Sequence, residues 1–490
     1  MAGCRKIKSV AVIGAGASGA ITAAALKAEQ YFDRIRIFER RESPGGMWLF
    51  DAAVRPSLVV PPGTIAPDVD LPLEAPDILP CVTSPNKQER FSQTPIYSSL
   101  LTNTPSVVMS YSDVPFPHGP FVPHHVARQY VESYFSIHQT DSLLVLNTTV
   151  EDLSQVACPS CEGHKEWKLA LRKHEPVQDV DIWWEENFDA VIIATGHYSI
   201  PHIPHVKGLK EYIGKFPGRI VHAKTYRKPH IFTSKRVVVV GSGISAIEIA
   251  KDLVPAVQLP VYMSRRSAPK VLIPIEGVEK RPMISEYLPD GRILFDNGEY
   301  LDNVDTVIYC TGYQPSYPFW NVKANGRPLW DYEQDRLIKS YLHTFFQDFP
   351  NLGIVGIQRT ITFRSFEYQA VALARAFTGR NAVDLPTVDE QVEWEIKTDK
   401  ESKTNNRTFH TLGVEDGGRR LWMEMLYKFA GPCTLSGRGR NPPVFGEKEQ
   451  EVVLKQKRAE LLSERRILLG QPGDGWIQVG DTKYDLLGFI

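Results

Sequence analysis

Two glycine-rich loops hold the residues of this 490-residue sequence that could do chemistry. In the first, the strand-like run 7–13 leads into G-A-G-A-S-G. Glycines at this spacing allow a tight turn, let backbone approach a pyrophosphate, and let the next helix pack closely on the strand. The free N–H groups at the start of that helix then point at the phosphates. This pattern predicts a dinucleotide site that includes Gly14, Gly16, Ala17, Ser18 and Gly19.

An acidic residue completes the first loop. A helical pattern over 20–30 is followed by a second strand-like run, 35–38, which ends at Glu39, 20 residues after Gly19. A carboxylate at this position can accept both hydroxyl groups of an adenosine ribose. Because strand, glycine loop, helix, strand and acid occur in this order, we expect the first loop to bind FAD.

The second loop has basic residues where the first has an acid. The apolar run 237–240 leads into G-S-G-I-S-A, and the next strand-like run, 259–263, leads into Ser264, Arg265 and Arg266. The planar fork of a guanidinium matches the oxygens of a 2′-phosphate. The second loop therefore predicts an NADPH site that includes Gly241, Ser242, Gly243, Ser245 and Arg265.

A longer pattern precedes the second loop, where Phe216, Gly218, His222 and Tyr226 fit F-x-G-x-x-x-H-x-x-x-Y. With F-E-R-R-E-S-P-G-G-M-W (38–48), L-L-T-N-T-P (100–105), A-T-G-H-Y (194–198) and Y-C-T-G-Y (309–313), the chain resembles the flavin-containing monooxygenases, most closely their soluble fungal members. The resemblance runs from about residue 6 to about residue 380. Related Baeyer–Villiger enzymes usually carry Trp at the position of Tyr226, so the tyrosine favours the heteroatom-oxidising branch.

The resemblance implies roles for further residues. Asn103 would be catalytic and would hold a C4a-hydroperoxyflavin, because an amide can donate and accept a hydrogen bond at once; in isolation it would be a turn asparagine. His222 and Tyr226 identify the family, but linker packing explains them at least as well as chemistry. Packing would also explain Trp48 and Gln369. The residues that the resemblance places at FAD are Gly46, Met47, Trp48, Thr102, Asn103, Val150 and Gln369, and at NADPH it places Tyr198.

The activity that the resemblance implies is an NADPH- and O2-dependent monooxygenation. NADPH reduces FAD, the reduced flavin traps O2, and a soft sulfur or nitrogen atom of a small thiol, thioether or amine takes one oxygen. A Baeyer–Villiger monooxygenase acting on ketones stays open as an alternative. So do an enzyme like the pyridine nucleotide–disulfide reductases, which would need a redox dithiol, and a non-enzymatic nucleotide sensor.

The pair Cys158 and Cys161, in C-P-S-C, is where a dithiol or half a zinc site could lie. No second CxxC occurs, and the pair stands between strand-like runs, so we expect a hairpin tip. His118, His124 and His125 lack an acidic partner at metal-ligand spacing. No metal site is predicted.

Composition excludes several classes of protein. The chain is 42% hydrophobic and 23% charged with a net charge of −1, which argues against nucleic acid or an anionic membrane surface as partner. Six cysteines make no disulfide framework. No apolar window is long enough to span a bilayer, and the start of the chain leaves no room for a signal peptide. We expect a cytoplasmic enzyme whose partners are a small nucleophile and O2; the oligomeric state stays open, a homodimer included.

The elements that position these residues are predicted to form an α/β fold of two Rossmann-like dinucleotide-binding domains. D-A-V-I-I-A-T-G (189–196) and D-T-V-I-Y-C-T-G (305–312) echo each other and bracket the second loop. We interpret them as the two points where the chain passes between domains. This places an NADPH domain, 199–313, inside a discontinuous FAD domain, 1–198 and 314–490. We also expect a proline-rich surface excursion over 51–94, a strand over 351–357, a meander near 143–151, 167–172 and 180–184, and helices near 124–139, 366–378, 387–400, 418–429 and 446–468.

Overall fold

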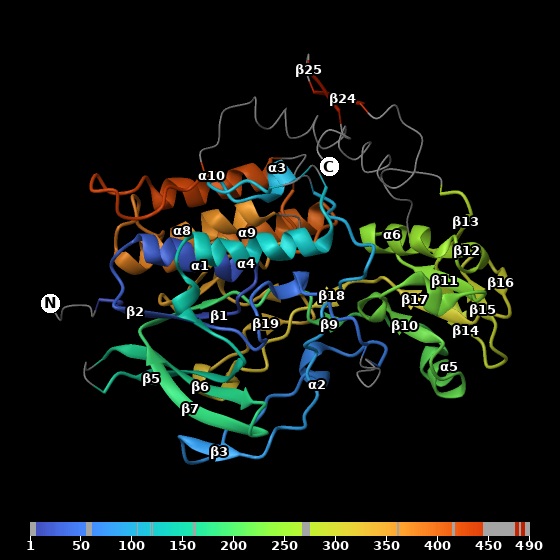
Figure 1. The fold of residues 1–490 in the computed structure, drawn as a ribbon, viewed down its shortest axis with the longest axis horizontal. Coiled ribbons are helices and arrows are strands. Elements are labelled where there is room, and N and C mark those ends of the chain that lie inside the picture. The colour runs from blue at the N-terminus through green and yellow to red at the C-terminus, as the bar shows by residue number, and fades with distance from the viewer. Residues whose placement is uncertain are drawn as a thin grey trace.

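The computed structural model consists of a larger and a smaller unit that lie side by side (Figure 1). It describes residues 6–54, 61–104, 106–117, 119, 121–159, 163–266, 275–359, 362–413, 417–443, 476–479 and 482–485. Among these residues, none of the helices combines the length and the apolar character that crossing a bilayer requires.

A seven-stranded sheet with the order β21-β22-β23-β8-β1-β2-β4 forms the centre of the larger unit. Its strands β23, β8, β1, β2 and β4 run parallel. The residues of β1 and β8 are buried almost throughout, which explains their continuous apolar runs. The strands are β1 (Ser9–Ile13), β2 (Arg34–Phe38), β4 (Leu144–Val145), β8 (Ala190–Ile193), β21 (Ser340–Tyr341), β22 (Phe345–Phe346) and β23 (Leu352–Ile354).

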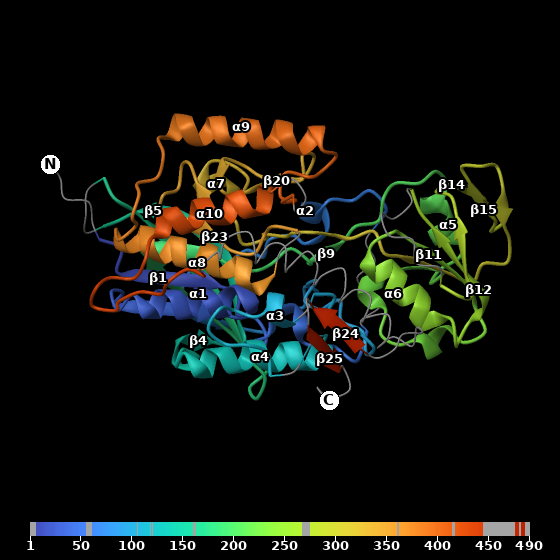
Figure 2. The same ribbon diagram turned by 90° about the horizontal axis from the view of Figure 1, so that it is seen from above.

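Helices cover one face of this sheet and a small antiparallel sheet covers the other (Figure 1). The helices are α1 (Ala17–Ala28), α4 (His124–Ile137), α8 (Phe363–Thr378) and α10 (Gly418–Ala430), with α9 (Val388–Thr404) at the outside (Figure 2). The small sheet, β3-β7-β6-β5, contains the expected meander of β5 (Thr148–Ala157), β6 (Lys165–Glu175) and β7 (Val180–Phe188). Its edge strand β3 (Cys81–Thr83) comes from the proline-rich segment and was not predicted.

The smaller unit is a second Rossmann-like fold. Its parallel sheet has the order β10-β17-β11-β12-β13, with α6 (Ile244–Leu253) on one side and α5 (Leu209–Lys215) and the sheet β14-β15-β16 on the other. The strands are β10 (Ile220–His222), β11 (Arg236–Val240), β12 (Gln258–Ser264), β13 (Val278–Arg281), β14 (Ile284–Tyr287), β15 (Ile293–Phe295), β16 (Tyr300–Leu301) and β17 (Thr306–Tyr309).

The chain enters the smaller unit through β9 (Ile200–Pro201) and leaves it through β18 (Tyr313–Gln314), and these two strands pair with each other. The fold is thus α/β, with one Rossmann-like unit inserted into another, as the echoed motifs predicted. The helix expected near 446–468 and Cys161 lie outside the described residues. The remaining short elements are α2 (Ala66–Val69), α3 (Ser106–Met109), α7 (Val322–Asn325), β19 (Trp330–Asp331), β20 (Arg336–Leu337), β24 (Trp476–Val479), β25 (Thr482–Asp485) and the 3₁₀ helices η1 (Gly46–Trp48), η2 (Asp141–Leu143), η3 (Ala223–Thr225) and η4 (Pro229–Phe232).

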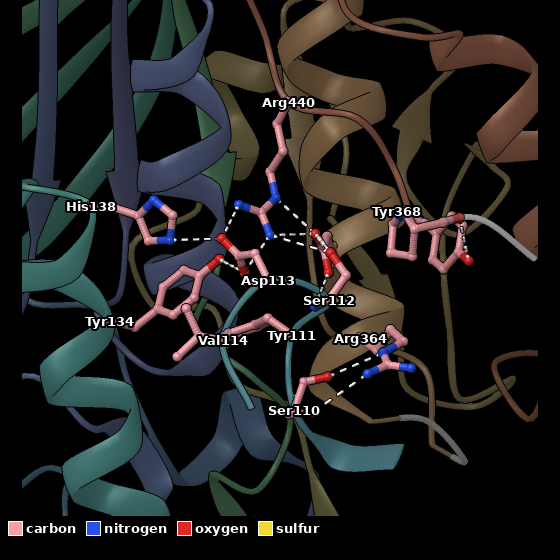
Figure 3. Close-up of polar contacts among 12 residues, drawn as sticks. Ser110, Tyr111, Ser112, Asp113, Val114, Tyr134, His138, Arg364, Tyr368 and Arg440 are labelled. Atoms are coloured by element: carbon pink, nitrogen blue, oxygen red, sulfur yellow. Dashed lines mark hydrogen bonds and ion pairs between the residues drawn. The ribbon is translucent and has the colours of Figure 1, made fainter. Parts of the chain in front are cut away.

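A segment after α10 crosses the helical face of the larger unit. Figure 3 shows Arg440 reaching from this segment toward Ser112 and Asp113, which follow α3. Its guanidinium donates to Glu367 of α8 at 2.7 Å and to Asp113 at 2.7 Å. His138, just after α4, contacts the same Asp113 at 3.0 Å. One arginine therefore ties three separate parts of the helical layer together.

Candidate active site

The first glycine loop joins β1 to α1 and needs glycine for steric reasons. Gly14 has a φ of +106°, and a Cβ there would lie 2.7 Å from the carbonyl oxygen of Ala194. Gly16 and Gly46 meet backbone to backbone, since a Cβ on Gly46 would lie 2.7 Å from the Cα of Gly16. No side chain caps the start of α1, so its first N–H groups are available to phosphate oxygens.

Glu39 lies at the end of β2 and is buried. Its carboxylate accepts hydrogen bonds from the backbone N–H groups of Ala15 at 2.8 Å and of Arg41 at 3.0 Å. These bonds hold the acid against the glycine loop and leave each oxygen further lone pairs for ribose hydroxyls. The geometry suits the adenosine half of a dinucleotide.

A cavity of about 1030 Å³ extends from this loop to the first turn of α6 in the smaller unit. This volume is at the upper end of the range for small-molecule sites, which fits a large cofactor with room beside it. Walls from the proline-rich segment, including Asp51 and Phe91, show that this excursion folds over the site. The predicted residues that line the cavity are Gly14, Gly16, Ala17, Ser18, Glu39, Gly46, Met47, Trp48, Thr102, Asn103, Val150, Tyr198 and Ser245.

Asn103 stands on an irregular segment that is held in place at its neighbour. The N–H of Thr102 donates to the carbonyl of Val122 at 2.9 Å, and the hydroxyl of Thr102 accepts from the N–H of Val122 at 3.1 Å. The side chain of Asn103 is exposed to the cavity, and its Oδ1 accepts one long hydrogen bond, 3.4 Å, from Thr104. The amide is therefore placed to bind a ligand.

The second glycine loop repeats the packing of the first. Gly241 has a φ of +139°, and a Cβ there would lie 2.6 Å from the carbonyl oxygen of Cys310. A Cβ on Gly14 would meet the carbonyl oxygen of Ala194 in the same way. A Cβ on Gly243 would meet nothing within 4 Å, so backbone here is open to a ligand. Gly241 donates to the carbonyl of Ser264 at 2.9 Å, which brings the next residue, Arg265, beside the loop.

Several predicted residues lie behind the cavity wall or beyond it. A Cβ on Gly19 would lie 2.0 Å from the carbonyl oxygen of Gly14, so Gly19 serves the packing of α1 on its loop. Gln369 is fully buried, and its Oε1 accepts from the N–H of Gly356 at 3.0 Å. Gln369 thus positions Gly356, which does line the cavity. Gly241, Ser242, Gly243 and Arg265 lie at the second loop, outside the lining.

His222 and Tyr226 have the contacts of linker packing. Burial lowers the pKa of His222 to about 3, and its Nδ1 accepts from the N–H of Lys224 at 3.0 Å. The Tyr226 hydroxyl donates to Asp252 of α6 at 2.6 Å, and its ring stacks on Phe232. Neither residue lines the cavity.

Lys224 and Arg227, which follow His222, also contact the proline-rich segment that forms one wall of the cavity. Arg227 is buried and donates to the carbonyl oxygens of Asp51, Lys224 and Thr94. The ammonium of Lys224 contacts the carbonyl oxygens of Phe91 and Ser199. The smaller unit is therefore fastened to the wall of the cavity.

The cavity lining also contains polar residues that were not among the predicted site residues, including Arg40, His197, Gln358 and Arg359. Arg40 could have been found, because it follows Glu39 directly in F-E-R-R-E. Gln358 and Arg359 follow β23 and belong to no motif, so only the fold reveals them.

Cys158 does not line the cavity. It begins the connection between β5 and β6, where its N–H donates to the carbonyl of His164 at 2.8 Å, so the hairpin-tip interpretation is confirmed for Cys158. Within the described part of the chain, no group of three or more His, Cys, Asp and Glu side chains is placed to hold a metal ion.

Comparisons with known proteins agree with this geometry. The family described as "Flavin-binding monooxygenase-like" matches residues 84–278, and "NAD(P)-binding Rossmann-like domain" matches residues 12–63. "Flavin-containing monooxygenase FMO GS-OX-like 8" of Arabidopsis thaliana is 30% identical over 404 residues, which cover 79% of this chain and 78% of that protein. "Flavin-containing monooxygenase iboF" of Amanita muscaria is 29% identical over 481 residues, 87% of this chain and 88% of that protein. The structure of S-allyl-L-cysteine S-oxygenase from Allium sativum has a TM-score of 0.73 at 24% identity and covers 95% of each chain, which shows a shared fold.

Proposed function

Because the chain belongs to the flavin-containing monooxygenase family, we propose that it transfers one atom of O2 to a soft sulfur or nitrogen atom of a small molecule. FAD and NADPH are its cofactors, and it is an oxidoreductase. The observation that carries the proposal is one cavity whose lining includes Ser18 at the first loop, Ser245 at the second loop and Asn103. A flavin and its reductant can meet there. The name of the Allium relative, an S-oxygenase, supports sulfur as one target.

The residues present fit both cofactors. The first loop, Glu39 and the backbone contact of Gly16 with Gly46 form a cradle for FAD, and the open backbone at Gly243 suits NADPH. We assign FAD to residues 1–198 and 314–490 and NADPH to residues 199–313. When bound, the flavin supplies the activation of O2.

The chain's own residues orient the reactants and exclude water. Trp48, Phe363 and Phe366 give the cavity an aromatic wall. The amide of Asn103 can donate from Nδ2 and accept at Oδ1, and it has no acidic proton to give away. It can therefore hold a polar oxygen at the reacting centre without protonating it. A soft nucleophile needs no side chain to activate it.

An isotope experiment tests the proposal. The purified protein is incubated with NADPH, ¹⁸O2 and a thioether, an amine or a ketone, and the products are analysed by mass spectrometry. We expect a sulfoxide or amine oxide that carries one ¹⁸O atom for each NADPH consumed. An ester formed from the ketone would favour a Baeyer–Villiger enzyme instead. Hydrogen peroxide as the sole product with every substrate would refute monooxygenation.

A further inference from the structure

The segment after β23 enters the cavity wall. Gly356, Gln358 and Arg359 line the cavity, and the carbonyl of Gly356 accepts from Nδ1 of His197 at 3.2 Å. This bond holds the segment against the first crossing between the two units. Burial, with a smaller contribution from the charge of Arg359, lowers the pKa of His197 to about 4. Near neutral pH, Arg359 is thus a cation beside an uncharged histidine.

The guanidinium of Arg359 has N–H donors that are not used by its protein partner. Among the described residues it donates to one partner, Asp335, through Nη2, and its side chain is 32% exposed. The cavity arginines Arg90 and Arg172 differ, because each donates to two carboxylates and is 12% exposed. Nε, Nη1 and the second N–H of Nη2 of Arg359 remain able to donate, so one edge of the guanidinium can still offer two parallel N–H groups. Arg40, a further cavity cation, adjoins Glu39 and so belongs to the adenosine end.

Gln358 supplies a second, independent observation. Its side chain is 1% exposed, and neither its Nε2 nor its Oε1 has a hydrogen-bond partner in the described part of the chain. Buried amides are nearly always hydrogen-bonded, because leaving one unpaired carries its full desolvation cost. A polar partner beside Gln358 is therefore expected.

A carboxylate is one ligand group that could provide partners for both side chains. A carboxylate accepts several hydrogen bonds and matches the guanidinium fork, and one of its oxygens can also accept from Nε2 of Gln358. We propose that Arg359 and Gln358 form a carboxylate-recognition site, so that the substrate is a thioether or amine that also carries a carboxylate. This inference rests on the proposed function and names its substrate class.

The carboxylate of Asp335 competes with a substrate carboxylate for Arg359. The Asp335 carboxylate already accepts from Nη2 of the same guanidinium, so a substrate carboxylate must share Arg359 with it. Replacing Asp335 by Asn removes this competing charge. Asn tolerates the φ of +52° at this turn position, so the backbone should be kept. The two partners of the ion pair therefore predict effects of opposite sign.

The test compares 3-(methylthio)propanoate with its uncharged isostere 3-(methylthio)propanamide. Binding to the oxidised, FAD-loaded protein is measured by calorimetry, and kcat and KM are measured with NADPH and O2. We expect Arg359→Leu to weaken binding of the acid about 10- to 100-fold, the effect of losing charge-assisted hydrogen bonds, and that of the amide less than about twofold. Gln358→Leu should weaken binding of the acid by a smaller factor than Arg359→Leu does. Asp335→Asn should strengthen binding of the acid. Arg336→Leu, next to Asp335 but paired with Glu395, is the matched control.

Three results would overturn the inference. They are equal binding of acid and amide by the natural protein, equal losses for both in Arg359→Leu, and a rise in the KM for NADPH in that variant. If the natural protein oxygenates the amide as readily as the acid, only the substrate class is wrong. If it oxygenates no thioether or amine, the proposed function is wrong, while the calorimetry still decides whether Arg359 binds a carboxylate.

Discussion

Asn103 is exposed in the cavity between the two glycine loops, and the bonds of Thr102 to Val122 fix its position. Asn103→Ser shortens the side chain and removes the amide donor. We expect the fraction of NADPH that ends as oxygenated product to fall roughly tenfold, the effect of one lost hydrogen bond of about 1.4 kcal/mol. Hydrogen peroxide should rise by the difference. Asn381→Ser, after α8, is the control, and unchanged coupling in Asn103→Ser would remove Asn103 from the mechanism.

Arg265 follows β12 at the second loop, where a 2′-phosphate would lie. Arg265→Ala should raise the KM for NADPH about 10- to 100-fold, because charge-assisted hydrogen bonds to the phosphate are lost. The KM for NADH should change less than about twofold. Arg292→Ala, an arginine of the same unit paired with Asp290, is the control. Equal increases for NADPH and NADH would mean that the phosphate binds elsewhere.

Residue types and spacing predicted the parts of the site that are local in sequence. The glycines at 14 and 241 and the acid at 39 could be recognised because each follows a strand at a set distance. Arg359 and Gln358 could not, because they enter the cavity only when β23 pairs with β8, some 160 residues earlier. Gln369 was predicted at the flavin, and the structure places its amide behind Gly356 instead of in the lining.

Among the elements, the segment that carries Arg440 depends on a buried charge pair. Glu367 is fully buried, and Arg440→Met would remove the opposite charge beside its carboxylate and leave it, within the described residues, only the hydrogen bonds from Ser112. We expect the free energy of unfolding to fall by about 3–5 kcal/mol. Arg440→Lys keeps a positive charge, so its free energy of unfolding should fall by less. Chemical denaturation measures both, and the double variant with Glu367→Gln should regain part of the loss. If it regains none, the contact is not the source of the stability.

The same cluster makes stability depend on acid pH. Burial alone would raise the pKa of Asp113, but hydrogen bonds from Arg440 and His138 lower it well below the usual 3.8. A carboxylate with a lowered folded-state pKa contributes its stability above the unfolded-state value and loses it as the pH falls. The cluster should therefore weaken below about pH 4, and denaturation curves of Asp113→Asn should show a smaller acid dependence than those of the natural protein.

The longer elements could be predicted from periodicity, and the connections between them could not. The helix expected over 366–378 begins three residues earlier, at Phe363, because its aromatic start packs against Trp48. The two-residue strands β21 and β22 carry no pattern of their own and exist because β23 offers an edge. Arg440 contacts Asp113, 327 positions away in the sequence, and no local sequence pattern predicts this contact.

For the molecule as a whole, Lys224 is one of the residues that hold the two units together. Its ammonium contacts carbonyl oxygens of the first crossing and of the proline-rich wall, and burial lowers its pKa to about 7. Between pH 7 and about 10 the unfolded chain therefore binds more protons than the folded one. The free energy of unfolding should rise with pH across this window, by up to about 1.4 kcal/mol per pH unit.

Lys224→Met should flatten that slope, and Lys210→Met, an exposed lysine of α5, should keep it. Urea denaturation at a series of pH values measures the difference. A slope that is the same in all three proteins would mean that another group titrates. The arrangement of two units could be predicted from the echoed motifs, but this fastening could not, because it depends on how the units meet.

The insertion of one unit into the other has a consequence for synthesis on the ribosome. The smaller unit is complete once Gln314 has been made, whereas β23, the partner of β8 in the larger sheet, begins at Leu352. Since chains fold domain by domain as they emerge, the inserted unit can fold first. Until β23 arrives, the edge of β8 stays open to pairing with other chains. A nascent chain stalled after residue 314 should therefore hold a folded inner unit within an outer one that is prone to aggregate.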